Sequence, residues 1–213
     1  MLNLDVFLPR LLPSAPNCPD PTARQALLDA AIEFCEETSI VRITTGPQYT
    51  AGTAVYTVGV PASQKVALTQ RAWYGQRELM PALSSMVANV DAYTSVTADP
   101  YQEPHSFLES APGEVTLFPA PGAMATQMLT FRVATKPSRA ATSVADVLFE
   151  DWAEAIVAGA LKRLHAIPDT SFFSDGHAMR RATEFQLGIN RARAEAQRGR
   201  VRGSIQTTYR AFA

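Results

Sequence analysis

Cysteine and histidine are scarce in this chain of 213 residues, which has two cysteines and three histidines. The histidines, His105, His165 and His177, stand in different segments, and none has a second metal-binding residue at a spacing typical of metal sites. Cys18 and Cys35 lie on either side of most of a predicted helix, which would place them more than about 20 Å apart. A disulfide needs Cα atoms about 4.4–6.8 Å apart. We therefore expect reduced thiols, as in a protein that folds in the cytosol, and no metal site.

Sequence motifs of catalysis are also missing. The chain has no glycine-rich phosphate loop followed by Lys and Ser or Thr, and no Gly-x-Ser-x-Gly nucleophile elbow. Four acidic residues gather at the start of a predicted helix, namely Asp146, Glu150, Asp151 and Glu154. The helix dipole favours negative side chains at that end, so they need no catalytic role. The sequence predicts a protein that is not an enzyme and that uses no cofactor.

Long apolar runs are absent too. No run reaches the roughly 18 apolar residues of a membrane-spanning helix, and the opening MLNLDVFLPRLLP contains Asp5 and two prolines where a signal peptide needs a continuous apolar segment. Hydrophobic residues make up 46% of the chain, enough at this length for a sizeable core. We expect a soluble protein with no membrane segment that is not secreted.

What the chain does have is a strong polarity of charge. Residues 1–159 contain 9 Lys and Arg against 16 Asp and Glu, a formal charge of −7, whereas residues 160–213 contain 10 against 4, a formal charge of +6. Such asymmetry bears on partners and on self-association rather than on fold.

An amphipathic helix is predicted to begin near Asp20, which is placed to cap it, with Pro21 at the first helical position. Its apolar residues recur every three or four positions, at Ala23, Leu27, Ala30, Ala31, Phe34 and Cys35. Its other face carries an acidic ridge of Asp29, Glu33, Glu36 and Glu37. This ridge is either solvated or the contact for a basic partner surface. The four prolines of residues 9–19 predict an extended segment before the helix.

Residues 40–139 favour short strands punctuated by glycine and proline. The predicted strands are 54–60, 65–74, 114–118 and 127–134, and Gly75 suits the turn of a hairpin that returns toward Leu79. Residues 99–112 are polar and are predicted to form a loop. We expect a small antiparallel sheet or sandwich here.

Two helices are predicted after the strands. Ser143 and Asp146 have the spacing of a helix cap, and Pro168 ends this helix. Gly159 inside it costs about 1 kcal/mol relative to Ala, which the close approach of another backbone would explain. The next helix begins near Asp175 and continues to about residue 197, so the two form a helical hairpin.

The predicted fold class is therefore α+β. A helical body combines residues 1–39 with the hairpin of residues 140–198, residues 40–139 form a central antiparallel β subdomain, and residues 199–213 form an extended C-terminal tail. The tail is too polar and glycine-interrupted for a core of its own. Its apolar residues recur at spacings of three to four with arginines beside them, as anchors for a partner groove: Arg200, Val201, Arg202, Ile205, Tyr209, Arg210 and Phe212.

The C-terminal arginines allow two interpretations. Arg191, Arg193, Arg198, Arg200 and Arg202 form a basic stripe that could bind phosphates. Few aromatic residues accompany the stripe, no DNA-binding motif is present, and the acidic first 159 residues would repel a duplex. A protein partner with an acidic groove fits the stripe better.

The order of these segments resembles the head-to-tail connector proteins of tailed bacteriophages, also called neck or portal adaptors. The resemblance is carried by FLPRLLPSAPNCPDPTARQALLDAAIEFCEET, VALTQRAWYGQREL, LFEDWAEAIVAGALKRLHAIPD and SFFSDGHAMRRATEFQLGINRARAEAQRG. These pieces together span nearly the whole chain.

The resemblance implies a structural protein of the virion neck, assembled in the host cytoplasm as a ring, usually of twelve copies, beneath the portal. The ring would extend the DNA channel, let genomic DNA pass without sequence-specific binding, and present a platform to a downstream tail or neck protein. The tail would reach the portal. The acidic ridge would meet Arg180, Arg181, Arg191 or Arg193 of a neighbouring copy, because a ring contact joins two different surfaces. The alternative function is a DNA-binding or DNA-packaging accessory protein, and a third alternative is an enzyme whose site has no recognisable motif.

Overall fold

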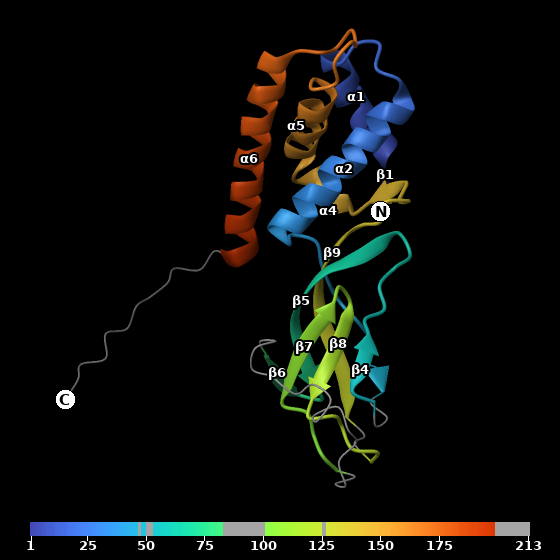
Figure 1. Ribbon diagram of the computed structural model, residues 1–213, viewed down its shortest axis with the longest axis vertical. Coiled ribbons are helices and arrows are strands. Elements are labelled where there is room, and N and C mark those ends of the chain that lie inside the picture. Colours follow the sequence, from blue (N-terminus) through green and yellow to red (C-terminus); the bar gives the residue numbers. More distant parts are fainter. Residues whose placement is uncertain (47, 50–52, 83–100, 125–126, 199–213) are drawn as a thin grey trace, which may run out of the picture.

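The computed structural model shows an elongated molecule with a helical body at one end and a curled β-sheet at the other (Figure 1). The structure describes residues 1–46, 48–49, 53–82, 101–124 and 127–198. Helices and strands occupy separate parts of the chain, so the α+β prediction is confirmed.

The proline-rich N-terminal segment is helical rather than extended. After the two-residue strand β1 (Leu2–Asn3) come the 3₁₀ turn η1 (Leu4–Phe7), helix α1 (Leu8–Leu11) and the 3₁₀ turn η2 (Leu12–Ser14). Pro9 and Pro13 stand in the first turns of α1 and η2. Proline is tolerated there because those backbone positions have no hydrogen-bond partner to lose. The extended prediction was therefore wrong.

Helix α2 (Asp20–Thr38) forms where its sequence period predicts. Pro19 occupies the capping position without a side-chain hydrogen bond, so Asp20 lies in the first turn rather than at the cap. The helix ends at Ser39, whose left-handed φ of 50° lets its amide bond the carbonyl of Cys35. All six predicted core positions are buried, namely Ala23, Leu27, Ala30, Ala31, Phe34 and Cys35.

The second predicted helix is divided in two. Ser143 belongs to strand β10 (Ser143–Val144), which pairs with β1, and the chain then forms α4 (Asp146–Glu150) and α5 (Ala153–Leu164). Trp152 interrupts the helix with a φ of −129°, and its buried ring lies 5.6 Å from the ring of Phe34. Burial of this large ring accompanies the break that the sequence pattern did not predict.

Helix α6 (Asp175–Arg198) begins where the sequence predicts and packs closely on α5. A Cβ placed on Gly159 would lie 2.7 Å from the ring of Phe185, and one on Gly188 would lie 2.5 Å from the Cβ of Ala155. A close approach therefore explains Gly159, although an aromatic ring makes it rather than a backbone.

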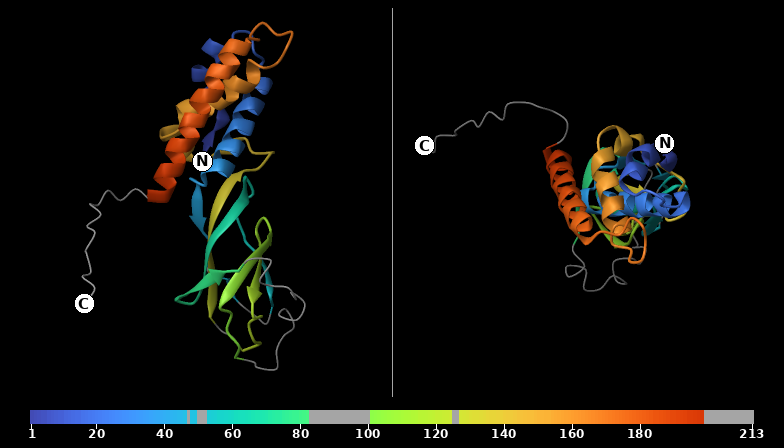
Figure 2. Two further views of the ribbon diagram at one scale, coloured as in Figure 1. Left: turned by 60° about the vertical axis from the view of Figure 1, so that its left-hand side comes forward. Right: turned by 90° about the horizontal axis from the view of Figure 1, so that it is seen from above.

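The core of the helical body lies between α2, α5 and α6, which run side by side (Figure 2). Its largest fully buried side chains are Phe7, Leu11, Leu27, Phe34, Leu148, Ile156, Leu161 and Phe185. Cys18 and Cys35 are free and buried, as predicted. Burial, with a smaller effect from the charge of Glu36, raises the pKa of the Cys35 thiol to about 12.

Eight strands form the curled sheet within the described residues. They are β2 (Arg42–Thr44), β3 (Gln48–Tyr49), β4 (Val55–Thr57), β5 (Gln64–Tyr74), β6 (Arg77–Pro81), β7 (Ser106–Ala111), β8 (Glu114–Phe118) and β9 (Met128–Pro137). The order is β2-β9-β5-β6-β7-β8-β4, and β3 also pairs with β9. Every pair is antiparallel except β6 with β7.

The sheet confirms the strongest strand predictions and corrects one. The β5–β6 hairpin turns at Gly75, whose φ is +60°. Strand β7, by contrast, lies inside the segment predicted as a polar loop. Its polar residues Ser106 and Glu109 are only partly buried, so polarity marked exposure rather than the lack of a strand.

The sheet is inserted between α2 and the rest of the helical body. The chain leaves α2 through β2 and returns through β9, and the Thr135 amide donates to the Val41 carbonyl at 2.9 Å. The two chain crossings are therefore adjacent. A second core fills the curl, and its members include Tyr56, Tyr74, Leu79, Phe107, Leu117, Leu129 and Phe131.

Candidate functional site

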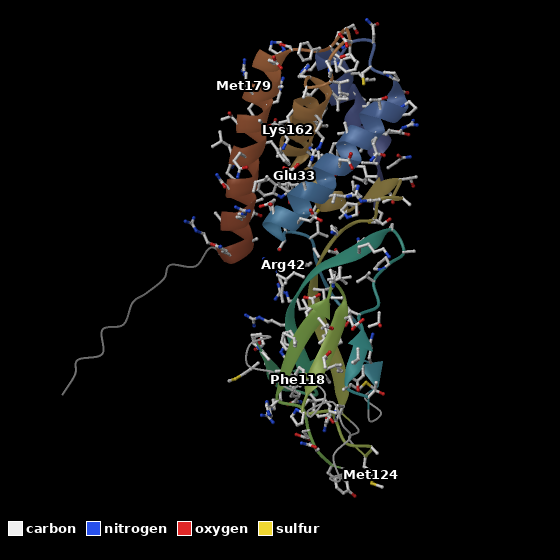
Figure 3. The ribbon with its side chains drawn as sticks, viewed as in Figure 1. Glu33, Arg42, Phe118, Met124, Lys162 and Met179 are labelled. Atoms are coloured by element: carbon white, nitrogen blue, oxygen red, sulfur yellow. The ribbon has the colours of Figure 1, made fainter. Side chains whose placement is uncertain are left out.

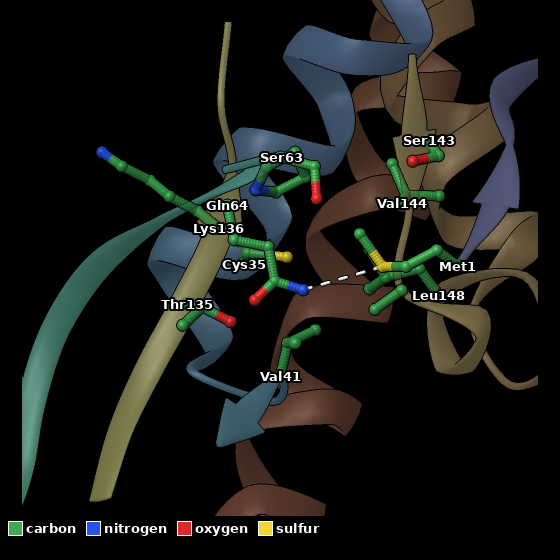
Figure 4. A pocket seen from close by; sticks show the side chains of 12 residues that line it. Met1, Cys35, Val41, Ser63, Gln64, Thr135, Lys136, Ser143, Val144 and Leu148 are labelled. Carbon is green, nitrogen blue, oxygen red and sulfur yellow. Dashed lines mark hydrogen bonds between the residues drawn. The ribbon is translucent and has the colours of Figure 1, made fainter. Parts of the chain in front are cut away.

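The junction between the helical body and the sheet has little room to bind a small molecule. A cavity of about 10 Å³ lies there between Cys35, Val41, Gln64, Thr135 and Leu148 (Figure 4). The Gln64 Nε2 donates to the Met1 Sδ at 3.7 Å, whereas the Gln64 Oε1 and Thr135 Oγ1 have no partner among the described residues. Such a volume holds about one water molecule.

A larger hollow of about 400 Å³ lies on the side of the helical body, lined by Asn3, Asp5, Arg24, Leu28 and Arg139 among others. The Arg24 Nε donates to the Asp5 Oδ1 at 2.5 Å across it. Within the described ranges, no three His, Cys, Asp or Glu residues are grouped as a metal site would need. No helix of those ranges has both the length and the apolar character to cross a membrane.

The acidic ridge of α2 contacts cations of its own chain. The Lys162 Nζ donates to the Glu33 Oε1 at 3.0 Å, and the Arg163 guanidinium donates to the other oxygen (Figure 3). Burial alone would raise the pKa of Glu33, but the hydrogen bond from Lys162 and the charges of both cations outweigh it and hold that pKa below 4.5. The Lys162 Nζ also lies 4.8 Å from the ring centroid of Phe185.

Two more ridge residues are paired in the same way. Glu36 bonds Lys136 of β9, and Glu37 bonds Arg193 of α6. The fourth, Asp29, accepts from Gln25 one turn earlier at 3.1 Å. These contacts join α2 to α5, α6 and the sheet, and so use charges that we expected to face a neighbouring copy.

The predicted basic partners have mixed surroundings. Arg180 and Arg181 both bond Glu184 of their own helix, at 3.2 and 2.7 Å. Arg191 is exposed and forms no ion pair within the described part of the chain. The ring contact between the acidic ridge and these arginines stays a prediction.

Sequence reasoning missed Lys136, Lys162 and Arg163 as partners of the ridge. Lys162 and Glu33 are 129 positions apart, so no local spacing relates them. One signal was available: Lys162 and Arg163 stand in the last turn of a helix expected to pack in the same body as α2.

Several of the exposed apolar side chains belong to α6 and to the sheet. On α6, Met179 and Leu187 are 74% and 59% exposed and stand eight residues apart on its outer side. Toward the end of the sheet that is far from the body, Met124 is exposed (Figure 3), and so is Met80, which pairs with Ser106 on the strand beside Phe118. Methionine is frequent at binding surfaces because its unbranched side chain adapts to different partners.

The end of α6 is held beside the sheet. The Arg42 Nη2 donates to the Ala196 carbonyl at 2.8 Å, and the Arg193 Nε donates to the Glu37 carbonyl at 2.7 Å. The predicted portal-binding residues lie outside the described residues, namely Arg200, Val201, Arg202, Ile205, Tyr209, Arg210 and Phe212. These contacts hold the C-terminal end of α6, at residue 198, next to β2 at the lower end of the body.

Comparison with known proteins supplies the family. The model of the SU10 adaptor protein family, a family of phage head-to-tail adaptors, matches residues 6–208. No match is found among curated protein sequences. Because the family model covers nearly the whole chain, the chain belongs to the SU10 adaptor protein family. Membership indicates a bacteriophage adaptor with a structural role in the virion.

Proposed function

We propose that this SU10 adaptor assembles as a ring of twelve copies beneath the portal, where it joins the capsid to the tail and extends the DNA channel. The family match across residues 6–208 carries this proposal. The shape of the chain supports it, because an elongated subunit with different ends can contact one partner above and another below (Figure 1). Subunits that associate head to tail around an axis close into a ring.

The portal is the proposed partner of the C-terminal tail. Arg42 and Arg193 fix the end of α6, so the tail begins at a defined point of each subunit. Its apolar residues at spacings of three to four would fill a groove of the portal, with the arginines beside them. The exposed far end of the sheet, with Met80 and Met124, is proposed to contact the downstream tail or neck protein.

Genomic DNA is proposed to pass through the ring without sequence-specific binding. A conduit must release its cargo, and tight binding to phosphates would oppose release. We expect duplex affinity no stronger than the non-specific range of roughly 10⁻⁴–10⁻⁶ M at about 150 mM salt. Nanomolar affinity for free duplex would favour the DNA-binding accessory function instead.

Electron microscopy of the full chain mixed with its cognate portal tests the ring directly. The expected image is a second ring stacked on the portal, with a copy number that can be counted. A portal that stays bare at saturating protein concentration would contradict the proposal.

Deletion of residues 199–213 tests the tail. The expected result is a thermal midpoint close to that of the full chain and a loss of portal binding. Substitution of Met179 by Ala serves as the matched control, because this exposed residue lies near the start of α6, whereas the deletion begins after the end of that helix. If the truncated chain binds the portal with wild-type affinity, the proposed role of the tail is wrong.

A further inference from the structure

The outer face of the sheet is unusually basic for its part of the chain. Residues 1–159 carry a net charge of −7, yet five cations share the surface of three adjacent strands. They are Arg42 of β2, Lys65 and Arg71 of β5, and Arg132 and Lys136 of β9, and we call them the basic sheet face.

Strand register places these cations next to one another. Lys65 is directly opposite Lys136, and Arg71 is directly opposite Arg132. In the pairing of β2 with β9, Thr44 is opposite Arg132. Arg42 stands two residues before Thr44, so it lies on the same face as Arg132 and diagonal to it. Residues directly opposite on one face have Cβ atoms about 4.5–5.5 Å apart, and like charges there are destabilising.

The chain compensates these charges only in part. Lys136 bonds Glu36, and the Arg71 Nη1 lies 3.5 Å from the Glu78 Oε1. Lys65 and Arg132 form no ion pair with any described residue. Arg42 donates only to backbone carbonyls, those of Ser39 and Ala196.

The surroundings of Arg42 agree with an excess of positive charge. Burial lowers the pKa of its guanidinium, and the nearby charge of Arg132 lowers that pKa further. An anion placed between Arg71 and Arg132 would therefore relieve repulsion and gain charge-assisted hydrogen bonds together.

We propose that the basic sheet face docks carboxylates of a second copy of this chain, supplied by Glu150 and Glu154 at the junction of α4 and α5. This inference rests on the proposed ring and specifies one of its contacts. Glu150 is the last residue of α4 and Glu154 lies in the first turn of α5. Both are exposed, and neither forms an ion pair within the described ranges. The charge of these two carboxylates is complementary to that of the two guanidiniums, Arg71 and Arg132, on neighbouring strands.

The position of the two surfaces supports a second copy as the occupant. Helix α4 lies at the lower end of the helical body, and Arg42 lies just below that body, so both surfaces are near the level of the junction (Figures 1 and 3). In a ring whose axis follows the long axis of the subunit, contacts join surfaces at one level. The two surfaces are also different, as a head-to-tail contact requires.

Charge reversal on each side gives a sharp test. One variant combines Arg71→Glu with Arg132→Glu, and the other combines Glu150→Lys with Glu154→Lys. Each variant alone faces like charge at every contact, which should raise the concentration for half-assembly at least about tenfold. An equimolar mixture should recover assembly, because alternating copies then pair opposite charges at every contact of a ring with an even copy number.

The measurement is sedimentation velocity of the full chain, alone and on purified cognate portal, with thermal unfolding to verify folding. The control combines Arg77→Glu with Arg139→Glu. Both arginines are exposed, and Arg77 is opposite Tyr74, which points into the sheet core instead of onto the basic sheet face. This control should assemble like the wild type.

Recovery in the mixture supports the contact. Folded variants that do not recover, beside a wild type that assembles, overturn it. If the Arg71 and Arg132 variant instead loses affinity for a 30-base-pair duplex and the mixture does not recover, the face binds phosphate and the docking proposal is wrong. A wild type that assembles neither alone nor on the portal overturns the ring itself, which is a separate result.

Discussion

In the helical body, acidic and basic side chains meet across helix boundaries, whereas on the outer face of the sheet basic side chains stand opposite one another. Glu33 contacts Lys162 and Arg163, and Glu37 contacts Arg193. Arg71 and Arg132 instead share a register position. The body uses its charges for its own packing, whereas Lys65 and Arg132 of the sheet form no ion pair with any described residue.

The two regions also differ in how they pack. Small residues let the body helices approach closely, as at Gly159 and Gly188. The sheet surrounds a core of larger side chains, such as Tyr56, Tyr74 and Phe131. Burial, and next the neighbouring Tyr74, raise the pKa of Tyr56 to about 12, so this hydroxyl stays protonated near neutral pH. If the regions are separate cooperative units, damage to one should spare the other.

Phe185→Ala should have the largest effect. The ring is fully buried between α5 and α6, and its removal should lower the free energy of unfolding by about 3–5 kcal/mol. Hydrogen exchange should show lost protection in α5 and α6 while β5 and β9 remain protected. Phe173→Ala is the control, since this ring is 45% exposed and should change stability by less than about 0.5 kcal/mol. Equal loss of protection in both regions would show a single cooperative unit.

Gly159→Ala should have the next largest effect on stability. The added Cβ would meet the buried Phe185 ring, and such overpacking costs about 1–3 kcal/mol, although the helix preference of Ala returns up to about 1 kcal/mol. Chemical denaturation should give a net loss of stability. Gly176→Ala in the same helix pair is the control, because its Cβ meets nothing within 4 Å and should be neutral or stabilising. A more stable Gly159→Ala variant would refute the tight contact.

Glu33→Gln should lower the stability of the body by about 1–2 kcal/mol at neutral pH, because charge-assisted hydrogen bonds are lost. The folded pKa of Glu33 lies below 4.5, so its contribution is present above that value and disappears as pH falls through the folded pKa. The difference in unfolding free energy between wild type and variant should therefore narrow below about pH 4.5.

Glu103→Gln, at an exposed position with no assigned role, is the control for Glu33→Gln and should leave stability nearly unchanged at every pH. If Glu33→Gln weakens ring formation without lowering stability, the acidic ridge faces a neighbour instead, as the sequence alone suggested.

Glu109→Gln should have the smallest effect of the four, roughly 1 kcal/mol, and should be confined to the sheet. The carboxylate accepts from the amides of Thr69 and Gly113 at 2.7 and 2.9 Å, which ties the β7–β8 hairpin to β5. Faster hydrogen exchange at those two amides, without a change in the body, is the expected result. Glu114→Gln in the same hairpin should leave both amides protected.

The regular spacing of apolar residues in the sequence predicted those elements in which buried residues recur at a regular interval. The apolar stripe of α2, the start of α6 and the turn at Gly75 all follow local rules, and the structure confirms them. No local rule predicted the break at Trp152. The helical pattern of the sequence continues through this position, and the break accompanies the packing of the large Trp152 ring against Phe34.

The contacts that carry the functional argument were harder to predict. Ion pairs between Glu33 and Lys162 depend on how helices distant in sequence pack, and a charged helix face does not show whether its partner belongs to the same chain. The basic sheet face was hidden in another way. Alternation along β5 alone places Lys65 and Arg71 on one side, but it does not show that β9 and β2 set Arg132, Lys136 and Arg42 beside them, because that depends on the pairing of strands distant in sequence.

The adjacent chain crossings between body and sheet have an evolutionary consequence. Val41, just before β2, accepts a hydrogen bond from the Thr135 amide of β9 at 2.9 Å, so a linker of about one or two residues could close the body after removal of the sheet. An insertion with such closely spaced ends can be exchanged as a unit without rerouting the rest of the chain. Recombination between phages could then replace the whole sheet while the helical body is inherited unchanged.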